Sequence, residues 1–509
     1  MDDAKTVGLP ARQVLAAFAR GELTPSAYLE ACLSRISRVN PFINALTAFD
    51  TERAVAEAAQ AGARWRAGSP RGPLDGLPLG VKDLQDTAGL LTTHGSPRAK
   101  ANLPASDLPM VARLRAAGAI VLAKTNVPEL GAGGNTRNPV WGATGNPFNP
   151  ALTVGGSSGG SAAALAADLL PICTGSDTGG SLRLPAAICG IVGYRPSVDV
   201  VAHPTRPLGW SGISVLGPMA RDVDDLILML RSVHWAHRND PLSVSYPADR
   251  FDNLADRPLH GLRLGYCEDF GGAPVDPDIR ATFLKRIEKI APKVAECRPV
   301  DMSLGAMDRV FDILRAEGFL TAFDGPVRET PDLFGPTIHA NVDLGRTFTL
   351  ADRGWAHAEQ TRILRAFNAR MQGLDAILLP TVPVTPFPWS EPHVAQIDGT
   401  EMDIYYRWLA LTYRGSLSGG PAITLPAGRD GAGMPFGLQM LGALRGDDEL
   451  LAVARTMEAF LEQDPETARP RPDLSRLRAV TPDLRSIVTH PPVLHPPRPG
   501  ADPTVRTAV

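Results

Sequence analysis

The stretch TVGGSSGGSAAALAADLL, residues 153–170, passes from a cluster of glycine and serine directly into a run of alanine and leucine. Clusters of this kind occur in flexible linkers, in phosphate-binding loops and in active sites. A linker is expected between polar flanks without pattern, whereas strong helix formers follow here. The phosphate-binding pattern G-x-x-x-x-G-K-[ST] has a lysine beside its last glycine, and this stretch has none. Taken alone, the stretch leaves the linker and active-site interpretations open, so the decision depends on the rest of the chain.

A second cluster of glycine and serine, TGSDTGGSLRLPAAICGIVG at residues 174–193, favours an active site. Ser181 follows two glycines, which have no Cβ to block a tight turn or the approach of a substrate. The backbone N–H groups of residues 178–181 can therefore turn toward one point. A concave set of backbone donors beside a hydroxyl is what an acyl-transfer enzyme needs to stabilise an oxyanion.

A serine hydroxyl attacks a carbonyl efficiently only when a base takes its proton, and two residues are candidates for that base. His94 lies close in the chain, but a lone histidine is more often structural. Lys82 ends an apolar, strand-like segment, where burial would lower its pKa from about 10.4 toward the roughly 7 to 8 that suits a general base. The simpler alternative for Lys82 is an ion pair with Asp83 or Asp86.

Three motifs together resemble those of the amidase signature family of serine hydrolases. Lys82 stands in GLPLGVKDLQDTAGLLTTHGS, Ser157 in GGSSGGSAA, and Ser181 in GSDTGGSLRLPAAICGIVGYRPS. Their separations along the chain suit the Ser-cisSer-Lys triad of that family. Further similar stretches, such as AKTNVPELG and LDAILLPTVPV, extend the resemblance over most of residues 10–465.

The resemblance implies a role for each residue of the two clusters. Ser181 would be the nucleophile, Ser157 the bridging serine that follows a cis peptide bond, and Lys82 the base. Their chemistry would need neither a metal nor an organic cofactor. The oxyanion hole would consist of the N–H groups of Thr178, Gly179, Gly180 and Ser181.

Three neighbouring residues are expected to support this triad. Ser158 resembles a serine that hydrogen-bonds Lys82 or its loop, although a plain turn serine fits this position nearly as well. Asp177 and Arg183 flank the nucleophile and are predicted to form a charge pair that orders the loop.

The fold is predicted to be α/β, because short apolar segments alternate with helical patterns along the chain. The resemblance implies one domain over residues 1–464, with a mixed, twisted β-sheet covered by helices on both sides. Its signature core would span about 70–215, and a divergent helical region for substrate specificity about 234–370. Residues 465–509 are rich in proline and are predicted to form a flexible tail.

Composition excludes several classes of partner. The 509 residues are 44% hydrophobic, and 51 Lys and Arg balance 54 Asp and Glu without a basic run, so no nucleic-acid or anionic membrane surface is expected. No apolar stretch reaches the roughly 18 residues of a membrane span, and the N-terminus lacks a secretory signal. We therefore expect a cytoplasmic monomer or homodimer that acts on a small-molecule amide or carbamate.

The substrate is less well defined than the chemistry. The candidate substrate-binding residues are Gly133, Gly134, Asn135 and the stretch from His203 to Trp210, together with Phe319, Phe323 and Phe334 of the helical region. Their aromatic and proline content favours anilides or aryl carbamates (urethanes), but the phenylalanines could equally belong to the core.

Two other functions compete with a free-standing amidase. The first is that of the glutamine-hydrolysing component of a tRNA-dependent amidotransferase, which would need partner proteins and tRNA. Residues 198–222 depart from the segment that usually follows the signature in that component. The second is a binding protein that kept the fold and lost its chemistry, against which the intact triad argues.

Overall fold

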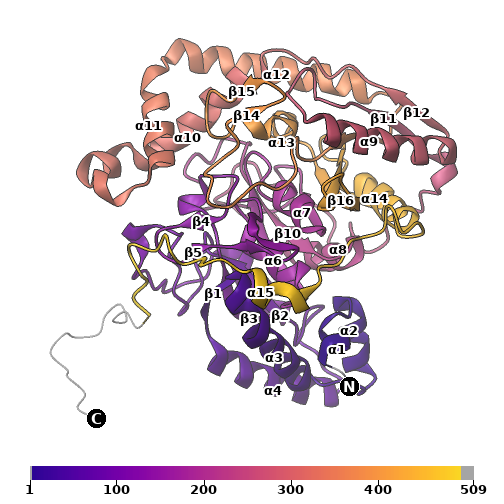
Figure 1. Ribbon diagram of the computed structural model, residues 1–509. Coiled ribbons are helices and arrows are strands. Elements are labelled where there is room, and N and C mark those ends of the chain that lie inside the picture. The colour runs from indigo at the N-terminus through magenta and orange to yellow at the C-terminus, as the bar shows by residue number, and fades with distance from the viewer. Residues whose placement is uncertain (1–2, 495–509) are drawn as a thin grey trace.

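The centre of the protein is an eleven-stranded mixed β-sheet, described with the rest of the chain for residues 3–494 in a computed structural model (Figure 1). Its strands are, in order across the sheet, β1 (Leu46–Phe49), β3 (Ile120–Thr125), β2 (Pro78–Lys82), β8 (Ile172–Asp177), β10 (Val215–Ala220), β9 (Val192–Arg195), β16 (Ala422–Arg429), β17 (Pro435–Leu441), β13 (Ala376–Pro380), β11 (Arg263–Tyr266) and β12 (Glu296–Pro299). Three antiparallel pairs lie outside this sheet: β4 (Arg137–Asn138) with β5 (Gly142–Ala143), β6 (Gly145–Asn146) with β7 (Asn149–Thr153), and β14 (Gln396–Ile397) with β15 (Thr400–Glu401).

Helices surround the sheet. They are α1 (Asp3–Val7), α2 (Ala11–Ala19), α3 (Pro25–Ile43), α4 (Thr51–Arg66), α5 (Pro109–Ala116), α6 (Gly159–Ala166), α7 (Arg183–Cys189), α8 (Val223–Val233), α9 (Pro277–Ile290), α10 (Met307–Glu329), α11 (Pro336–Thr347), α12 (Leu350–Met371), α13 (Ala410–Ser416), α14 (Asp447–Leu461) and α15 (Leu477–Val480). Within the described residues, none of these helices combines the length and the apolar composition that a membrane span requires.

Each face of the sheet has its own hydrophobic core. Successive side chains of a strand point to opposite faces, so Ile172 of β8 belongs to one core and Cys173 to the other. Helices α6 and α7 contribute to the second core, whereas α5, α8 and α14 contribute to the first. The predicted α/β fold, a mixed sheet with helices on both sides, is confirmed.

Parallel strands bring the chemistry to one edge of the sheet. β2 ends at Lys82 and β8 ends at Asp177, and the two strands pair in parallel through Leu79 with Ile172 and Gly80 with Cys173. The carboxyl ends of parallel strands meet at the same edge, which is where open α/β sheets bind ligands. Lys82 and the loop that follows Asp177 are therefore neighbours although about a hundred residues separate them.

The region 234–370 contains two short strands beside the helices that the sequence indicated. It contributes β11 and β12, which pair in parallel with each other and extend the sheet beyond β13. These strands are only four residues long, which left little pattern to recognise. The rest of the region forms α9 to α12, of which α10, α11 and α12 lie together at the top of Figure 1.

Residues 465–494 do not form a free tail, so that part of the expectation is corrected. Leu477 of α15 and Leu484 are both nearly fully buried. The carbonyl of Leu484 accepts a hydrogen bond from the N–H of Ala143, and Figure 1 shows the segment passing from α15 toward β5. The frequent prolines prevent a periodic hydrophobic pattern in the sequence. Isolated leucines nevertheless pack into the protein and hold the segment against it. The rest of the predicted tail, 495–509, lies outside the described residues.

Candidate active site

The stretch of glycine and serine is a tight turn into a buried helix and not a linker. Ser157 and Ser158 directly precede α6, and the peptide bond between Gly156 and Ser157 is cis. A Cβ on Gly160 would collide with the backbone nitrogen of Asn126 and stand 2.6 Å from the carbonyl oxygen of Ala45. Only glycine allows α6 to approach so closely, and this approach holds both serines beside the end of β2.

The amine of Lys82 is surrounded by serine oxygens. Its Nζ donates to the hydroxyls of Ser157 at 2.8 Å, Ser158 at 2.8 Å and Ser176 at 2.9 Å. The lysine is fully buried, and its backbone N–H donates to the hydroxyl of Thr174. The predicted contact between Ser158 and Lys82 is present, so Ser158 is more than a turn residue.

Burial decides the protonation of Lys82. Removal from water disfavours the ammonium form and lowers the pKa of Lys82 to about 7, against the opposing influence of the Asp177 carboxylate. A neutral amine is therefore available near neutral pH, and its lone pair can accept a proton from a bonded hydroxyl. The lysine is suited to act as a general base.

Asp83 and Asp86, the alternative partners of Lys82, and His94, the alternative base, form other contacts. Asp83 accepts hydrogen bonds from the N–H and the hydroxyl of Thr93, and Asp86 lies 3.3 Å from the Nε2 of His94. Lys82 therefore does not form the ion pair with Asp83 or Asp86 that was its simpler alternative. Its amine contacts three serines instead. His94 lines the cavity that opens above these serines, but its ring faces Asp86.

Asp177 holds the loop that leads to Ser181 in place. It forms the predicted pair with Arg183 through two hydrogen bonds of 3.0 and 3.1 Å. A second arginine, Arg195, adds a contact of 3.2 Å, and all three charged residues are fully buried. The two guanidinium groups hold the pKa of Asp177 well below its usual range despite burial. Asp177 is a permanent anion around which the loop to Ser181 turns.

The loop from Thr178 to Ser181 has one member with a different role from the one predicted. Gly180 has a φ of +126°, which favours glycine, and its N–H donates to Asp177 Oδ1 at 2.8 Å. That N–H is engaged by the carboxylate, so Gly180 shapes the loop. Thr178 and Ser181 line the cavity, and Gly179 packs against Phe311 and Tyr413.

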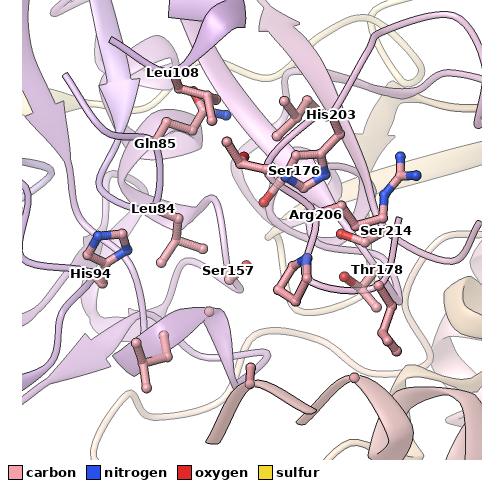
Figure 2. Close-up of a pocket in the computed structure, with 18 of the residues that line it drawn as sticks. Leu84, Gln85, His94, Leu108, Ser157, Ser176, Thr178, His203, Arg206 and Ser214 are labelled. Carbon is pink, nitrogen blue, oxygen red and sulfur yellow. The ribbon is translucent and has the colours of Figure 1, made fainter. Parts of the chain in front are cut away.

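A cavity of about 670 Å³ opens above the serines. In Figure 2, Ser157 lies between Leu84 and Thr178, with His94 beyond Leu84 and Arg206 and His203 toward the opposite side. The serines that line the cavity near Lys82 are Ser157, Ser176 and Ser181. Its apolar wall consists of Leu84, Leu108, Leu130, Leu208, Ile213, Leu216, Leu314, Phe319, Ala322 and Phe323.

Four of the candidates for substrate binding, Gly133, Gly134, Asn135 and Trp210, do not line this cavity. Gly134 packs against the ring of Trp408, where a Cβ would stand 2.6 Å from Cζ2, and Gly133 lies behind Gly156. Asn135 donates to the carbonyls of Trp389 and Glu391. These three are structural supports of the serine loop, because their contacts are with backbone and ring atoms behind it.

The fourth residue, Trp210, is 81% exposed and lies outside the cavity. The stretch that precedes it does contribute to the wall, since the cavity is lined by His203, Thr205, Arg206, Pro207 and Leu208. Phe319 and Phe323 line it as well, while Phe334 packs behind Phe323 with ring centroids 6.2 Å apart.

Sequence reasoning missed Ser176 and Arg195. Ser176 lies in β8 one residue before Asp177, and its hydroxyl is the third oxygen around Lys82. Strand alternation from Asp177 could have indicated that Ser176 faces the other way, toward the lysine. Arg195 ends β9, two strands from β8 across β10, and no local pattern connects it with Asp177.

Comparison with known proteins agrees with this geometry. The model of the Amidase family matches residues 27–451. The chain belongs to the amidase signature family. An acylamidase of Rhodococcus erythropolis is 32% identical over 89% of this amidase and 95% of the relative. A glutamyl-tRNA(Gln) amidotransferase component of Roseiflexus sp. (strain RS-1) is 33% identical over 86% of this chain and 93% of its own.

The fold comparison leads to the same family. A bacterial aryl acylamidase, described as one of the amidase signature enzymes, superposes with a TM-score of 0.83 at 25% identity. The alignment covers 89% of this amidase and 96% of that chain. The protein is therefore an enzyme of the amide-hydrolysing class.

Proposed function

We propose that this amidase hydrolyses amides that have a hydrophobic or aromatic group beside the scissile bond, such as anilides and aryl carbamates, through an acyl-enzyme on Ser181. The observation that carries the proposal is the buried amine of Lys82, 2.8 Å from the hydroxyl of Ser157 beneath a cavity that Ser181 lines. The carbonyl oxygen of Ser181 also accepts from the N–H of Ser158, which ties the two serine loops together.

In the first step, the oxygen of Ser181 attacks the substrate carbonyl carbon. The proton of Ser181 passes to Ser157 while the proton of Ser157 passes to the neutral amine of Lys82. Charge develops on the carbonyl oxygen, and the N–H groups of Thr178, Gly179 and Ser181 are the proposed donors to it. Gly180 is omitted from this set because Asp177 holds its N–H.

In the second step, the C–N bond breaks and the leaving amine takes the proton back from Lys82 through Ser157. An ester between the acyl group and Ser181 is left. Water then attacks the ester carbonyl and gives its proton to the same relay, and the C–O bond to Ser181 breaks. The products are an amine and a carboxylic acid, or an amine and a carbonate monoester from a carbamate.

The cavity supports a hydrophobic substrate. Six leucines, one isoleucine and two phenylalanines supply the apolar part of the wall, and burial of an apolar group there contributes roughly 25 cal/mol per Å². Two acids on the wall are already paired, Asp86 with His94 and Asp107 with Arg115. An aromatic ring can therefore bind without stripping water from an unpaired carboxylate.

Glutamine hydrolysis within an amidotransferase is the second candidate, because relatives with that name align over most of both chains. Glutamine carries an ammonium group beside its carboxylate, and the ammonium would need an acid on the wall. Both wall carboxylates have partners, so free-standing hydrolysis of a hydrophobic amide is favoured.

The test is release of p-nitroaniline from short acyl and aryl anilides, and of the amine from a matched aryl carbamate. Ser181→Ala should lower kcat by at least about 10⁴-fold, because removal of a nucleophile leaves only binding and oxyanion stabilisation. The matched control is exposed Ser69→Ala, which should keep wild-type rates. Near wild-type turnover by Ser181→Ala would refute the nucleophile. Ammonia release from glutamine without anilide turnover would favour the amidotransferase.

A further inference from the structure

Arg315 is a buried cation on the wall of the catalytic cavity. It lies on α10, is only 9% exposed, and lines the cavity together with Leu314, Gly318 and Phe319. A guanidinium removed from water normally has a carboxylate beside it, because an unpaired buried charge is costly. The partners of Arg315 therefore matter for what the cavity binds.

The groups that contact the Arg315 guanidinium are neutral. Its Nε donates to Asn341 Oδ1 at 3.0 Å, and its Nη2 donates to the hydroxyl of Tyr405 at 2.6 Å. The guanidinium carbon lies 4.7 Å from the ring centre of Phe319 and 4.9 Å from that of Tyr406. These contacts fix the plane of the guanidinium and stabilise it through cation–π attraction, but supply no counter-charge.

The nearby carboxylates have other cations. Asp312 on the same helix accepts from Arg407 at 2.8 Å and from the hydroxyl of Tyr406, and Asp308 pairs with Arg414 at 2.8 Å. Within residues 3–494, Arg315 has no ion pair. The other arginine of the cavity wall, Arg206, does have one, with Asp240 at 3.5 Å.

Arg315 is also close to the nucleophile loop. Phe311 lies four residues earlier on α10, and a Cβ on Gly179 would stand 2.8 Å from its ring. Residues four apart on a helix share one face about one turn apart, so Arg315 lies roughly 6 Å further along α10. A substrate bound at Ser181 would thus extend toward Arg315 after a few bonds.

We infer that Arg315 binds a carboxylate at the far end of the substrate. This inference rests on the proposed function and narrows it to amides or carbamates with a hydrophobic or aromatic middle and an anionic end. A carboxylate would complete the fixed guanidinium with a charge-assisted hydrogen bond and neutralise the buried cation. Arg315 would then determine specificity and would take no part in bond cleavage.

The test compares substrates that differ only in charge. Glutaryl and valeryl p-nitroanilide place a carboxylate or a methyl group on the acyl side. The butyryl amides of 4-aminobenzoate and 4-aminoacetophenone place a carboxylate or an acetyl group on the amine side. Wild type should prefer the anionic member of one pair by roughly 10- to 100-fold in kcat/KM, the range of a charge-assisted bond. The preferred pair identifies the side of the substrate that faces Arg315.

Variants separate specificity from structure. Arg315→Gln should abolish the preference while the neutral substrates keep most of their rate, and Arg315→Lys should keep part of it. The matched control is Arg309→Gln on the same helix, an exposed arginine that stacks on Trp355 and pairs with Asp352. Equal loss of rate on both members of each pair in Arg315→Gln would overturn the inference and assign Arg315 a structural role.

Binding provides a readout that does not need turnover, because stabilisation by a ligand can be compared between wild type and Arg315→Gln. Glutarate should raise the melting temperature of wild type, whereas pentanamide should not. If no amide is hydrolysed but glutarate stabilises the protein through Arg315, the proposed function fails and the anion site stands. If wild type shows neither a preference nor stabilisation by glutarate, the anion site fails even where neutral anilides are hydrolysed.

Discussion

Two lysines at the ends of neighbouring parallel strands have the same burial and different surroundings. Lys82 ends β2, and Lys124 lies in β3, where it pairs with Val81 while Thr125 pairs with Lys82. Adjacent register positions place the two side chains on opposite faces of the sheet. Burial lowers the pKa of Lys82 to about 7 and that of Lys124 to about 8.

The difference between the two lies in their partners. The amine of Lys124 donates to the carbonyl of Gln85 and the hydroxyl of Thr87, and the carboxylate of Asp83 opposes the effect of burial on its pKa. The amine of Lys82 donates to three serine hydroxyls, and two of these serines, Ser157 and Ser176, line a cavity. A lowered pKa is thus not sufficient for catalysis. A base also needs a hydroxyl partner that can reach the substrate.

Of the two lysines, Lys82 should give the larger effect on rate when it is replaced. Lys82→Met fills the same volume without an amine and should lower kcat by roughly 10³-fold, within the range for loss of a general base. Lys82→Arg should be just as inactive, because a guanidinium stays protonated and cannot accept a proton. Steady-state kinetics on an anilide measure both, with circular dichroism as the control for folding. Substantial activity in Lys82→Arg would mean that the positive charge, and not a neutral base, supports the reaction.

Replacement of Lys124 should instead affect stability. Lys124→Met leaves the carbonyl of Gln85 and the hydroxyl of Thr87 without their buried donor, and a buried polar group left unsatisfied in this way costs about 1 to 3 kcal/mol. Urea denaturation measures this loss in the free energy of unfolding. The activity that is left should have the pH dependence of wild type, since Lys82 is untouched. An altered pH midpoint of activity without a loss of stability would contradict this prediction, because it would show that Lys124 influences the titration of Lys82.

The candidate catalytic centre was predictable because its parts are local motifs that resemble those of a known family. The cluster around Ser157 and the one around Ser181 each combine glycines that permit close approach with a serine, and Lys82 interrupts an apolar strand. Parallel pairing of β2 with β8 then follows from the α/β pattern, and it brings the motifs to one edge. The fold class and the ion pair of Asp177 with Arg183 were expected from the sequence pattern, and the contact of Ser158 with Lys82 was one of two alternatives that the family resemblance left open.

The substrate wall was less predictable because it is assembled from distant segments. Leu84, Ile213 and Phe323 line one cavity, but no pattern within any of their segments shows that they meet. Gly133 and Gly134 looked like a substrate loop, yet their lack of a Cβ serves packing against Gly156 and Trp408. A glycine pair indicates close approach of some group, and only the tertiary structure tells whether that group is a ligand or a ring.

The smallest predicted effect concerns the hydroxyls that surround Lys82. Activity of wild type should rise with pH through about 7 and fall about tenfold per pH unit below it, because the neutral lysine is the active form and its pKa lies near 7. The hydroxyl of Ser158 accepts from Lys82 at 2.8 Å and so favours the ammonium form. Ser158→Ala should therefore move the acidic limb to lower pH by less than about one unit and lower kcat only about three- to tenfold. Profiles of kcat/KM against pH for both proteins measure the shift. A midpoint that moves to higher pH in Ser158→Ala would contradict the assignment of this limb to Lys82.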